Sequence, residues 1–384
     1  MKYKNLFFLS LGMFALGFDA YIIAGLIPEV SADFHTSYAI TGQAVTVFTL
    51  CYAISAPLLT VFLSKKNAKF SLILALIIFS LANFLSALTT DLTFFFICRA
   101  LAGVGAGLFA PIALSSATQL CDTSMRGRAL GFTLGGMSCG TVIGVPAGLY
   151  LSHLFNWELA LILVSLIGLF ALIGITLKMP VIPTLKQSTI KERFNIFTNI
   201  KVTNVVIVTF LTALASLGLY TYVAPLIHSF DNNASLIPFL WFWGVGGLVG
   251  SFAIGYIIDW SKKPKHVLVW VLITLALSYL LLLFSLEHSV TYLAMISMFL
   301  WGAMGWASMA PQQHILVELS PNNTNTTLGL NSSLNYLGGA VGAMSGGLLL
   351  TTQNYVYLPL AACGITIISL LLHAALTFKS NSVN

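Results

Sequence analysis

Long apolar segments dominate the chain, and short polar segments separate them. Twelve of the apolar segments reach the length of about 20 residues that a helix needs to cross a bilayer. They cover residues 5–27, 40–63, 70–89, 93–118, 129–151, 157–177, 203–226, 236–259, 266–286, 290–312, 326–350 and 355–377. The pattern predicts an all-α membrane protein with twelve transmembrane helices. A linker (180–201) is expected to join two pseudo-symmetric six-helix bundles, residues 1–179 and 202–384.

Two stripes of glycines support the division into two similar halves. Residues of one stripe lie four apart on one helix face, where another backbone can approach closely. The first stripe is Gly136, Gly140 and Gly144, and the second, 202 positions later, is Gly338, Gly342 and Gly346. Pro146 and Gly148 follow the first stripe. Because proline lacks a backbone donor, Pro146 is expected to break the helix ladder.

Composition and the distribution of charge indicate a membrane protein and do not indicate a nucleic-acid partner. Only 7% of residues are charged and the mean hydropathy is +0.94, whereas soluble domains carry about 25% charged residues. Of the 17 Lys and Arg residues, 16 fall on one side of the expected spans. The positive-inside rule then places both termini and the linker in the cytoplasm. Topology therefore explains the net charge of +6, and no nucleic-acid partner is expected.

Asp19 is the most informative single residue. Of the eleven acidic residues, ten fall at the ends of expected helices or in loops, but Asp19 does not. It lies nine residues before Pro28, at a depth of about 13 Å. A carboxylate at a helix centre costs about 2.5–3.5 kcal/mol to insert, so Asp19 is expected to have a partner or a function.

Arg99 is the candidate partner of Asp19. It lies seven residues beyond Leu92, at a depth of about 10 Å. Opposite charges at similar depths lower each other's insertion cost if their helices are neighbours. Two alternatives remain open: Arg99 extends outward along the lipid, and Asp19 makes only a local hydrogen bond.

Polar and aromatic residues in the second half are candidates for contact with a small molecule. One helix face carries a run of hydroxyl groups, although such groups can also bond to their own backbone. The candidates are Thr209, Thr212, Ser216, Tyr220, Trp301, Trp306, Asn331 and Asn335. Trp241 and Trp243 are instead expected in the aromatic belt at the membrane surface. Gln312, His314 and Glu318 are expected at an interfacial helix end.

Several motifs are absent. No glycine loop ends in Gly-Lys-Ser/Thr, so a nucleoside triphosphate is not expected as an energy source. No Cys/His set has zinc spacing, and no catalytic constellation is found. The sequence therefore predicts neither an enzyme nor a bound metal or cofactor. Any transport is expected to depend on an ion gradient or on the gradient of the substrate.

Four motifs resemble the major facilitator superfamily. They are GVPAG (144–148), Arg99 followed by Gly103, RGRALGF (126–132) and PQQ (311–313). The chain is most similar in these motifs to the bacterial twelve-helix drug:proton antiporter branch, which includes sugar-efflux and purine-nucleoside-efflux proteins. One departure is clear. In the loop after the second expected helix, Ser64 stands where the family's loop motif has Asp. The second half of the chain contains a second copy of this motif (Gly255, Asp259, Lys262), which matches the family's pattern better.

The resemblance implies a monomeric exporter of the bacterial cytoplasmic membrane. Two bundles would rock about a central cavity and exchange protons for a small organic molecule, with Asp19 as the proton carrier and Arg99 as its charge partner. It also implies an antiporter motif (Gly136, Gly140, Gly144, Pro146, Gly148) and a cytoplasmic gate (Gly255, Asp259, Lys262, Arg126, Arg128). An importer or uniporter of a metabolite is the main alternative, followed by a receptor that does not transport.

Overall fold

A computed structural model describes residues 3–63, 66–122, 125–182, 198–351 and 354–379. Those residues form helices and connecting turns, with no strand among them. The chain divides into two compact units, residues 1–189 and 190–384, and each unit is described by itself. Most of the expected linker, residues 183–197, lies outside the described residues.

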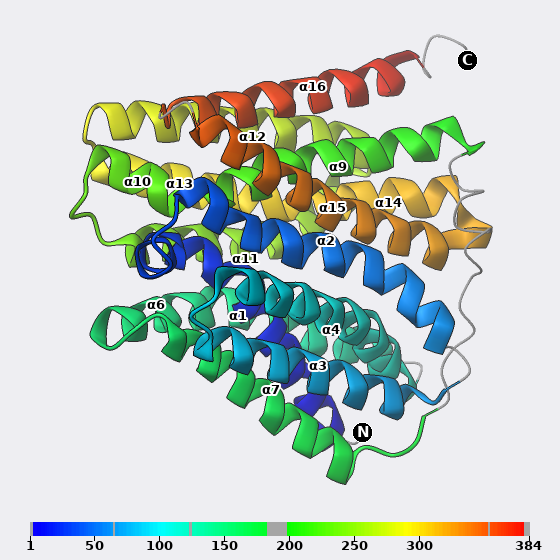
Figure 1. The fold of residues 1–384 in the computed structure, drawn as a ribbon. Helices are drawn as coiled ribbons and strands as arrows, with labels where there is room; N and C mark the ends of the chain where they lie inside the picture. Colours follow the sequence, from blue (N-terminus) through cyan, green and yellow to red (C-terminus); the bar gives the residue numbers. More distant parts are fainter. Residues whose placement is uncertain (1–2, 64–65, 123–124, 183–197, 352–353, 380–384) are drawn as a thin grey trace. The chain divides into compact units, whose positions relative to one another are not determined.

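Among its described residues, the first unit has six helical segments long and apolar enough to span a membrane; Figure 1 shows their arrangement. They are α1 (Tyr3–Asp33), α2 (Tyr38–Phe62), α3 (Ala68–Leu88), α4 (Leu92–Gln119), the run α5–η3–α6 (Arg126–Cys139, Gly140–Gly144, Val145–Leu154) and α7 (Glu158–Lys178). Side-chain caps begin three of these helices, because a short polar side chain accepts a hydrogen bond from an otherwise unpaired N–H group. Ser37 caps α2, Asn67 caps α3 and Asp91 caps α4.

The fifth segment continues past Pro146 instead of breaking. The N–H group of Val145 bonds to the carbonyl oxygen of Gly140, five residues earlier, so η3 is a π-helical turn. Pro146 follows at the start of α6, where a missing donor is tolerated. The expected break is therefore wrong: the extra residue in the turn lets the helix accommodate the proline.

The second unit is built from longer and shorter helices (Figure 1). They are α9 (Ile200–Thr221), α10 (Val223–Phe230), α11 (Leu236–Ser261), α12 (Pro264–Glu287), α13 (Thr291–Ala307), α14 (Met309–Leu319), η5 (Pro321–Asn323), α15 (Thr324–Leu350) and α16 (Tyr357–Lys379). Two expected spans are interrupted here. α9 ends four residues before Pro225, and α13 ends four residues before Pro311. A proline ring crowds the carbonyl group four residues earlier, which explains both interruptions.

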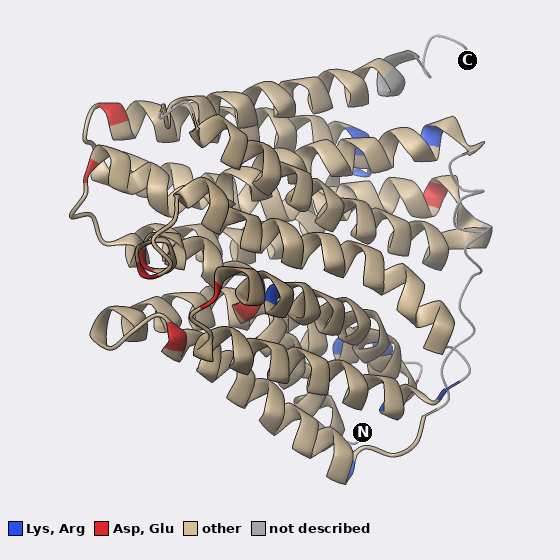
Figure 2. Ribbon diagram, viewed as in Figure 1, with Lys and Arg blue, Asp and Glu red and all other residues tan. Residues whose placement is uncertain are grey.

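The twelve-helix prediction is confirmed. Eleven helical segments of the described residues are long and apolar enough to span a membrane. The twelfth, α15, has 27 residues, but glycine and polar side chains lower its hydropathy. Within each unit the charged residues lie mainly at helix ends (Figure 2). In the first unit, Asp33, Asp91 and Glu158 lie at one set of helix ends, and Arg126 and Lys178 lie at the other.

Candidate functional site

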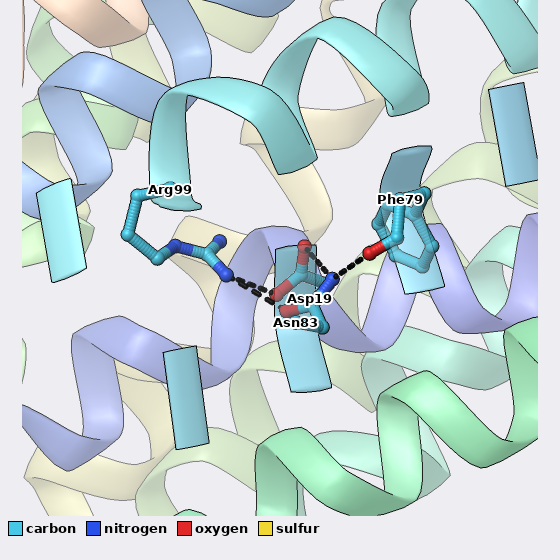
Figure 3. A network of polar contacts seen from close by, with 4 residues as sticks. All are labelled: Asp19, Phe79, Asn83 and Arg99. Carbon is cyan, nitrogen blue, oxygen red and sulfur yellow. Dashed lines mark hydrogen bonds and ion pairs between the residues drawn. The ribbon is translucent and has the colours of Figure 1, made fainter. Parts of the chain in front are cut away.

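Asp19 and Arg99 form a buried ion pair in the first unit. Asp19 lies midway along α1 and Arg99 in the first third of α4, and the two helices are in contact. The side chains are 0% and 1% exposed, and the Arg99 Nη1 atom lies 2.8 Å from the Asp19 Oδ1 atom (Figure 3). No other Asp, Glu, Lys or Arg side chain in the described part of the chain is buried. The structure therefore places in contact the two charged side chains that were expected to be partners because they lie at similar depths in their spans.

Asn83 of α3 is the third member of this site. Its Nδ2 atom donates to the Asp19 Oδ2 atom at 3.2 Å, and its Oδ1 atom accepts from Arg99 Nη1 at 2.9 Å (Figure 3). Nδ2 also donates to the backbone carbonyl oxygen of Phe79 at 3.1 Å. Sequence reasoning missed Asn83. Its signal was available, since Asn83 is the only Asn or Gln residue within an otherwise largely apolar span, α3.

An aromatic ring completes the surroundings of Arg99. The guanidinium carbon lies 4.8 Å from the centroid of the Phe48 ring, a cation–π distance. Gly103 allows this approach, because a Cβ atom at Gly103 would overlap the backbone carbonyl oxygen of Phe48. The Arg-x-x-x-Gly spacing thus has a physical explanation. The arginine supplies the charge, and the glycine one turn later lets α2 bring a ring against it.

The first glycine stripe packs against α1, the helix that carries Asp19. A Cβ atom at Gly136 or Gly140 would overlap the carbonyl oxygen of Ser10 or Phe14. At Gly144 a Cβ atom would lie 2.9 Å from the Phe18 ring. Neither helix can move sideways here without losing contact over several turns. The stripe therefore fixes the position of α1 immediately beside the ion pair.

Two more glycines outside the stripe, Gly148 of α6 and Gly17 of α1, extend the contact between the fifth segment and α1. A Cβ atom at Gly148 would lie 2.6 Å from the Phe18 ring, and one at Gly17 would overlap the carbonyl oxygen of Met137. The Thr141 hydroxyl donates to the Gly17 carbonyl oxygen at 3.3 Å. This close packing buries the α1 backbone at Gly17, two residues before Asp19.

The second glycine stripe has an equivalent place in the second unit, where α15 packs along α9. A Cβ atom at Gly338 or Gly342 would overlap the carbonyl oxygen of Phe210 or Leu214. The eleventh span thus contacts the seventh as the fifth contacts the first. That correspondence is the one expected of two related halves.

Two candidate residues of the second unit, Thr209 and Asn331, meet Gln312 in a buried polar cluster. The Thr209 hydroxyl lies 2.8 Å from the Gln312 amide oxygen and 2.6 Å from the Asn331 amide oxygen. It also lies 3.1 Å from the Val205 carbonyl oxygen. One hydroxyl has a single proton, so it donates to only one of these acceptors at a time. The prediction of an interfacial position is wrong for Gln312, which is 0% exposed.

The other hydroxyls of α9 also point to neighbouring helices. Thr212 lies 3.2 Å from the Ser369 hydroxyl of α16, and Ser216 accepts a hydrogen bond from Trp301 Nε1 at 2.8 Å. Tyr220 stacks on Trp243 with ring centroids 4.3 Å apart. The belt prediction is therefore wrong for Trp243, which is 1% exposed.

Trp241, which was expected in the aromatic belt, and the remaining candidates, Trp306 and Asn335, are more accessible. Trp241 is 53% exposed, whereas Trp306 and Asn335 are half-buried, and Trp306 contacts the Trp243 ring edge-on at 5.6 Å. His314 and Glu318, 3.2 Å apart, form an exposed pair at the end of α14, as expected of a helix terminus.

The predicted gate residues are split between the two units. Arg126 and Arg128 begin α5 and are exposed. Gly255 and Asp259 lie on an exposed face of α11, and Lys262 ends that helix in a left-handed conformation, with φ at 53°. Their role as a gate stays a prediction.

Comparisons with known proteins agree on one family. The profile of the Major Facilitator Superfamily matches residues 9–343, with a further match at 260–383. The MFS-type transporter YbcL of Bacillus subtilis is 27% identical over 89% of this chain and 88% of its own. The inner membrane transport protein YdhP of Escherichia coli K12 is 24% identical over 95% and 93%.

Solved structures of the same fold cover nearly the whole chain. A D-xylose–proton symporter superposes with a TM-score of 0.81 over 97% of both chains, at 16% sequence identity. The nucleoside transporter NupG superposes with a TM-score of 0.78 over 98% of this chain and 99% of its own, also at 16% identity. At such identities the likeness concerns the fold. The profile and the full-length relatives show that this chain belongs to the Major Facilitator Superfamily, as a multi-pass membrane transporter and not an enzyme.

Proposed function

We propose that this transporter exports a small organic molecule in exchange for protons, with Asp19 as the proton carrier. The observation that carries the proposal is the buried Asp19–Arg99 pair, with its 2.8 Å contact between two spans. Buried intramembrane carboxylates are costly and mark proton relays in pumps and transporters. The described residues offer no second buried carboxylate for this task.

The pair gives a simple coupling mechanism. In the present conformation Arg99 contacts the Asp19 carboxyl group, and the glycine stripe packs against α1 beside it. A conformational change that separates the pair would remove the attraction of the Arg99 charge and favour uptake of a proton by the carboxyl group. Substrate that competes for the same carboxyl group would displace the proton, so that the two move in opposite directions.

Export is supported by the resemblance of GVPAG to the antiporter motif. The distribution of Lys and Arg supports a bacterial cytoplasmic membrane location with both termini and the linker (180–201) in the cytoplasm. In that orientation the proposed gate residues lie on the cytoplasmic side. The working unit is proposed to be one chain, in which residues 1–179 and 202–384 act as the two moving bundles.

Import is the second candidate. A protonated carboxyl group can accompany a substrate as well as exchange with it, and the D-xylose–proton symporter has the same fold at 16% identity. The two directions differ in the sign of the proton flux. Substrate added to one side drives protons toward that side in antiport and away from it in symport.

Purified protein tests the proposal in two steps. A thermal-shift screen with ethidium, D-xylose and inosine as first probes selects a ligand. Proteoliposomes containing a fluorescent pH indicator then report proton movement when that ligand is added. We expect counterflow of protons in the wild type and in Asp231→Asn, which changes an exposed acid, and no proton movement in Asp19→Asn. Proton movement in Asp19→Asn at the wild-type rate would refute the assignment, and co-directional flux would refute antiport.

A further inference from the structure

Asn83 presents both a donor and an acceptor to the buried ion pair. Resting on the proposed role of Asp19, we propose that Asn83 is a positioning residue that keeps Arg99 in place while Asp19 carries a proton. Its side chain is 0% exposed and contacts both charged groups (Figure 3). A neutral amide is suited to this role, because it can pair with the cation without adding charge of its own.

The orientation of the Asn83 amide follows from its partners. Nδ2 faces two acceptors, the Asp19 carboxylate and the Phe79 carbonyl oxygen, so it must be the nitrogen. Oδ1 faces Arg99, which can only donate. The bond to Phe79, on the same helix one turn earlier, fixes the amide whether or not Asp19 is ionised.

The Nη1 atom of Arg99 divides its two hydrogens between two oxygens. Asp19 Oδ1 lies at 2.8 Å and Asn83 Oδ1 at 2.9 Å. When Asp19 takes a proton, the guanidinium loses its charged partner but keeps the Asn83 oxygen and the face of the Phe48 ring. A buried cation without any partner would be strongly unfavourable. Asn83 therefore makes the protonated state of Asp19 attainable.

Removal of Asn83 has two opposing effects. The carboxylate loses a donor at 3.2 Å, which favours its protonation, and Arg99 loses an acceptor at 2.9 Å, which opposes it. The second effect is expected to dominate, because the arginine contact is shorter and is the one that remains when Asp19 is neutral. Asn83→Leu should therefore make proton uptake at this site harder.

Asn83→Asp should have the opposite effect. The substitution keeps the size of the side chain and places a second carboxylate beside Arg99. Two carboxylates that share one cation bind a proton more readily than one, so the site takes up its proton at higher pH. An amide that only packed helices together would change stability alone, and neither substitution would move the pH dependence of proton binding.

The test is the pH profile of proton uptake by purified protein in weakly buffered detergent, with the profile of Asp19→Asn subtracted. We expect Asn83→Leu to move the profile toward acid and Asn83→Asp to move it toward alkali. Ser165→Ala is the matched control, since it removes a 2.8 Å hydrogen bond to α3 at Ser80 without touching the charged groups. Its profile should stay unchanged.

The outcomes separate this inference from the proposed function. A wild-type profile that equals that of Asp19→Asn refutes the role of Asp19 itself. A wild-type profile that differs, with no shift or reversed shifts in the Asn83 variants, overturns only the positioning role. If Asn83→Leu does not fold, Asn83→Asp decides alone, because it preserves the size of the residue.

Discussion

Alanine substitutions at two adjacent glycines should distinguish the effect of a close helix–helix contact on stability from the effect of helix propensity. Gly135 and Gly136 both lie in α5, but a Cβ atom at Gly135 meets nothing within 4 Å. At Gly136 it would overlap the Ser10 carbonyl oxygen and lie 2.8 Å from the carbonyl carbon. Ser10 belongs to α1, so its backbone cannot give way by a change of rotamer. The helix would have to move.

Two contributions set the difference in stability between the two alanine variants. Replacement of glycine by alanine in a helix interior favours the helix by up to about 1 kcal/mol, and this term is shared by both variants. Overpacking of a tight contact costs about 1–3 kcal/mol, and only Gly136→Ala incurs it. We therefore expect Gly136→Ala to be less stable than Gly135→Ala by about 1–3 kcal/mol.

Denaturation of both purified variants in a titration with SDS, followed by far-UV circular dichroism, measures this difference. Gly135→Ala should be as stable as the wild type or slightly more stable. Gly136→Ala should unfold at lower SDS and also transport more slowly, because α1 carries Asp19. Equal stability of the two variants would refute the close approach of α1 to the glycine stripe.

Three further predictions concern the buried polar groups, and thermal unfolding in detergent tests each of them. Arg99→Leu should destabilise the protein by about 3–5 kcal/mol by leaving Asp19 without its partner, and Asp19→Asn in the same chain should recover part of the loss; no recovery would argue against the pair. Trp301→Phe and Ser216→Ala should each cost about 1 kcal/mol and, combined, less than the sum, whereas full additivity would exclude their hydrogen bond. Gln312→Leu should cost about 1–3 kcal/mol, because it removes a buried amide from a hydrogen-bonded cluster; wild-type stability would contradict its buried position.

Charge and depth were readable from the sequence. Asp19 and Arg99 lie at similar depths in their spans. Because an unpaired charge inside a membrane is costly, two opposite charges at one depth are expected to form a pair. The glycine stripes were equally readable, since spacing by four defines a helix face. The sequence could not say which helix would pack against that face, because that choice depends on how all the helices of a unit pack together.

Other features could not be read in the same way. Trp243 and Gln312 were expected at the membrane surface, yet both are buried against other helices of their unit. Position along a span gives depth, but the rotation of a helix about its axis decides which side chains face its neighbours. Pro146 shows a related limit: its effect depends on whether the backbone can insert a π-helical turn, as it does at η3.

The central claim is that the carboxyl group of Asp19 gains and loses a proton inside the protein. Infrared difference spectroscopy on acidification tests this most directly, because a protonated carboxylic acid has a C=O stretching band that a carboxylate lacks. We predict a band that appears in the wild type and in Asp231→Asn and is missing in Asp19→Asn. The same band in Asp19→Asn, with unchanged amplitude, would contradict the account.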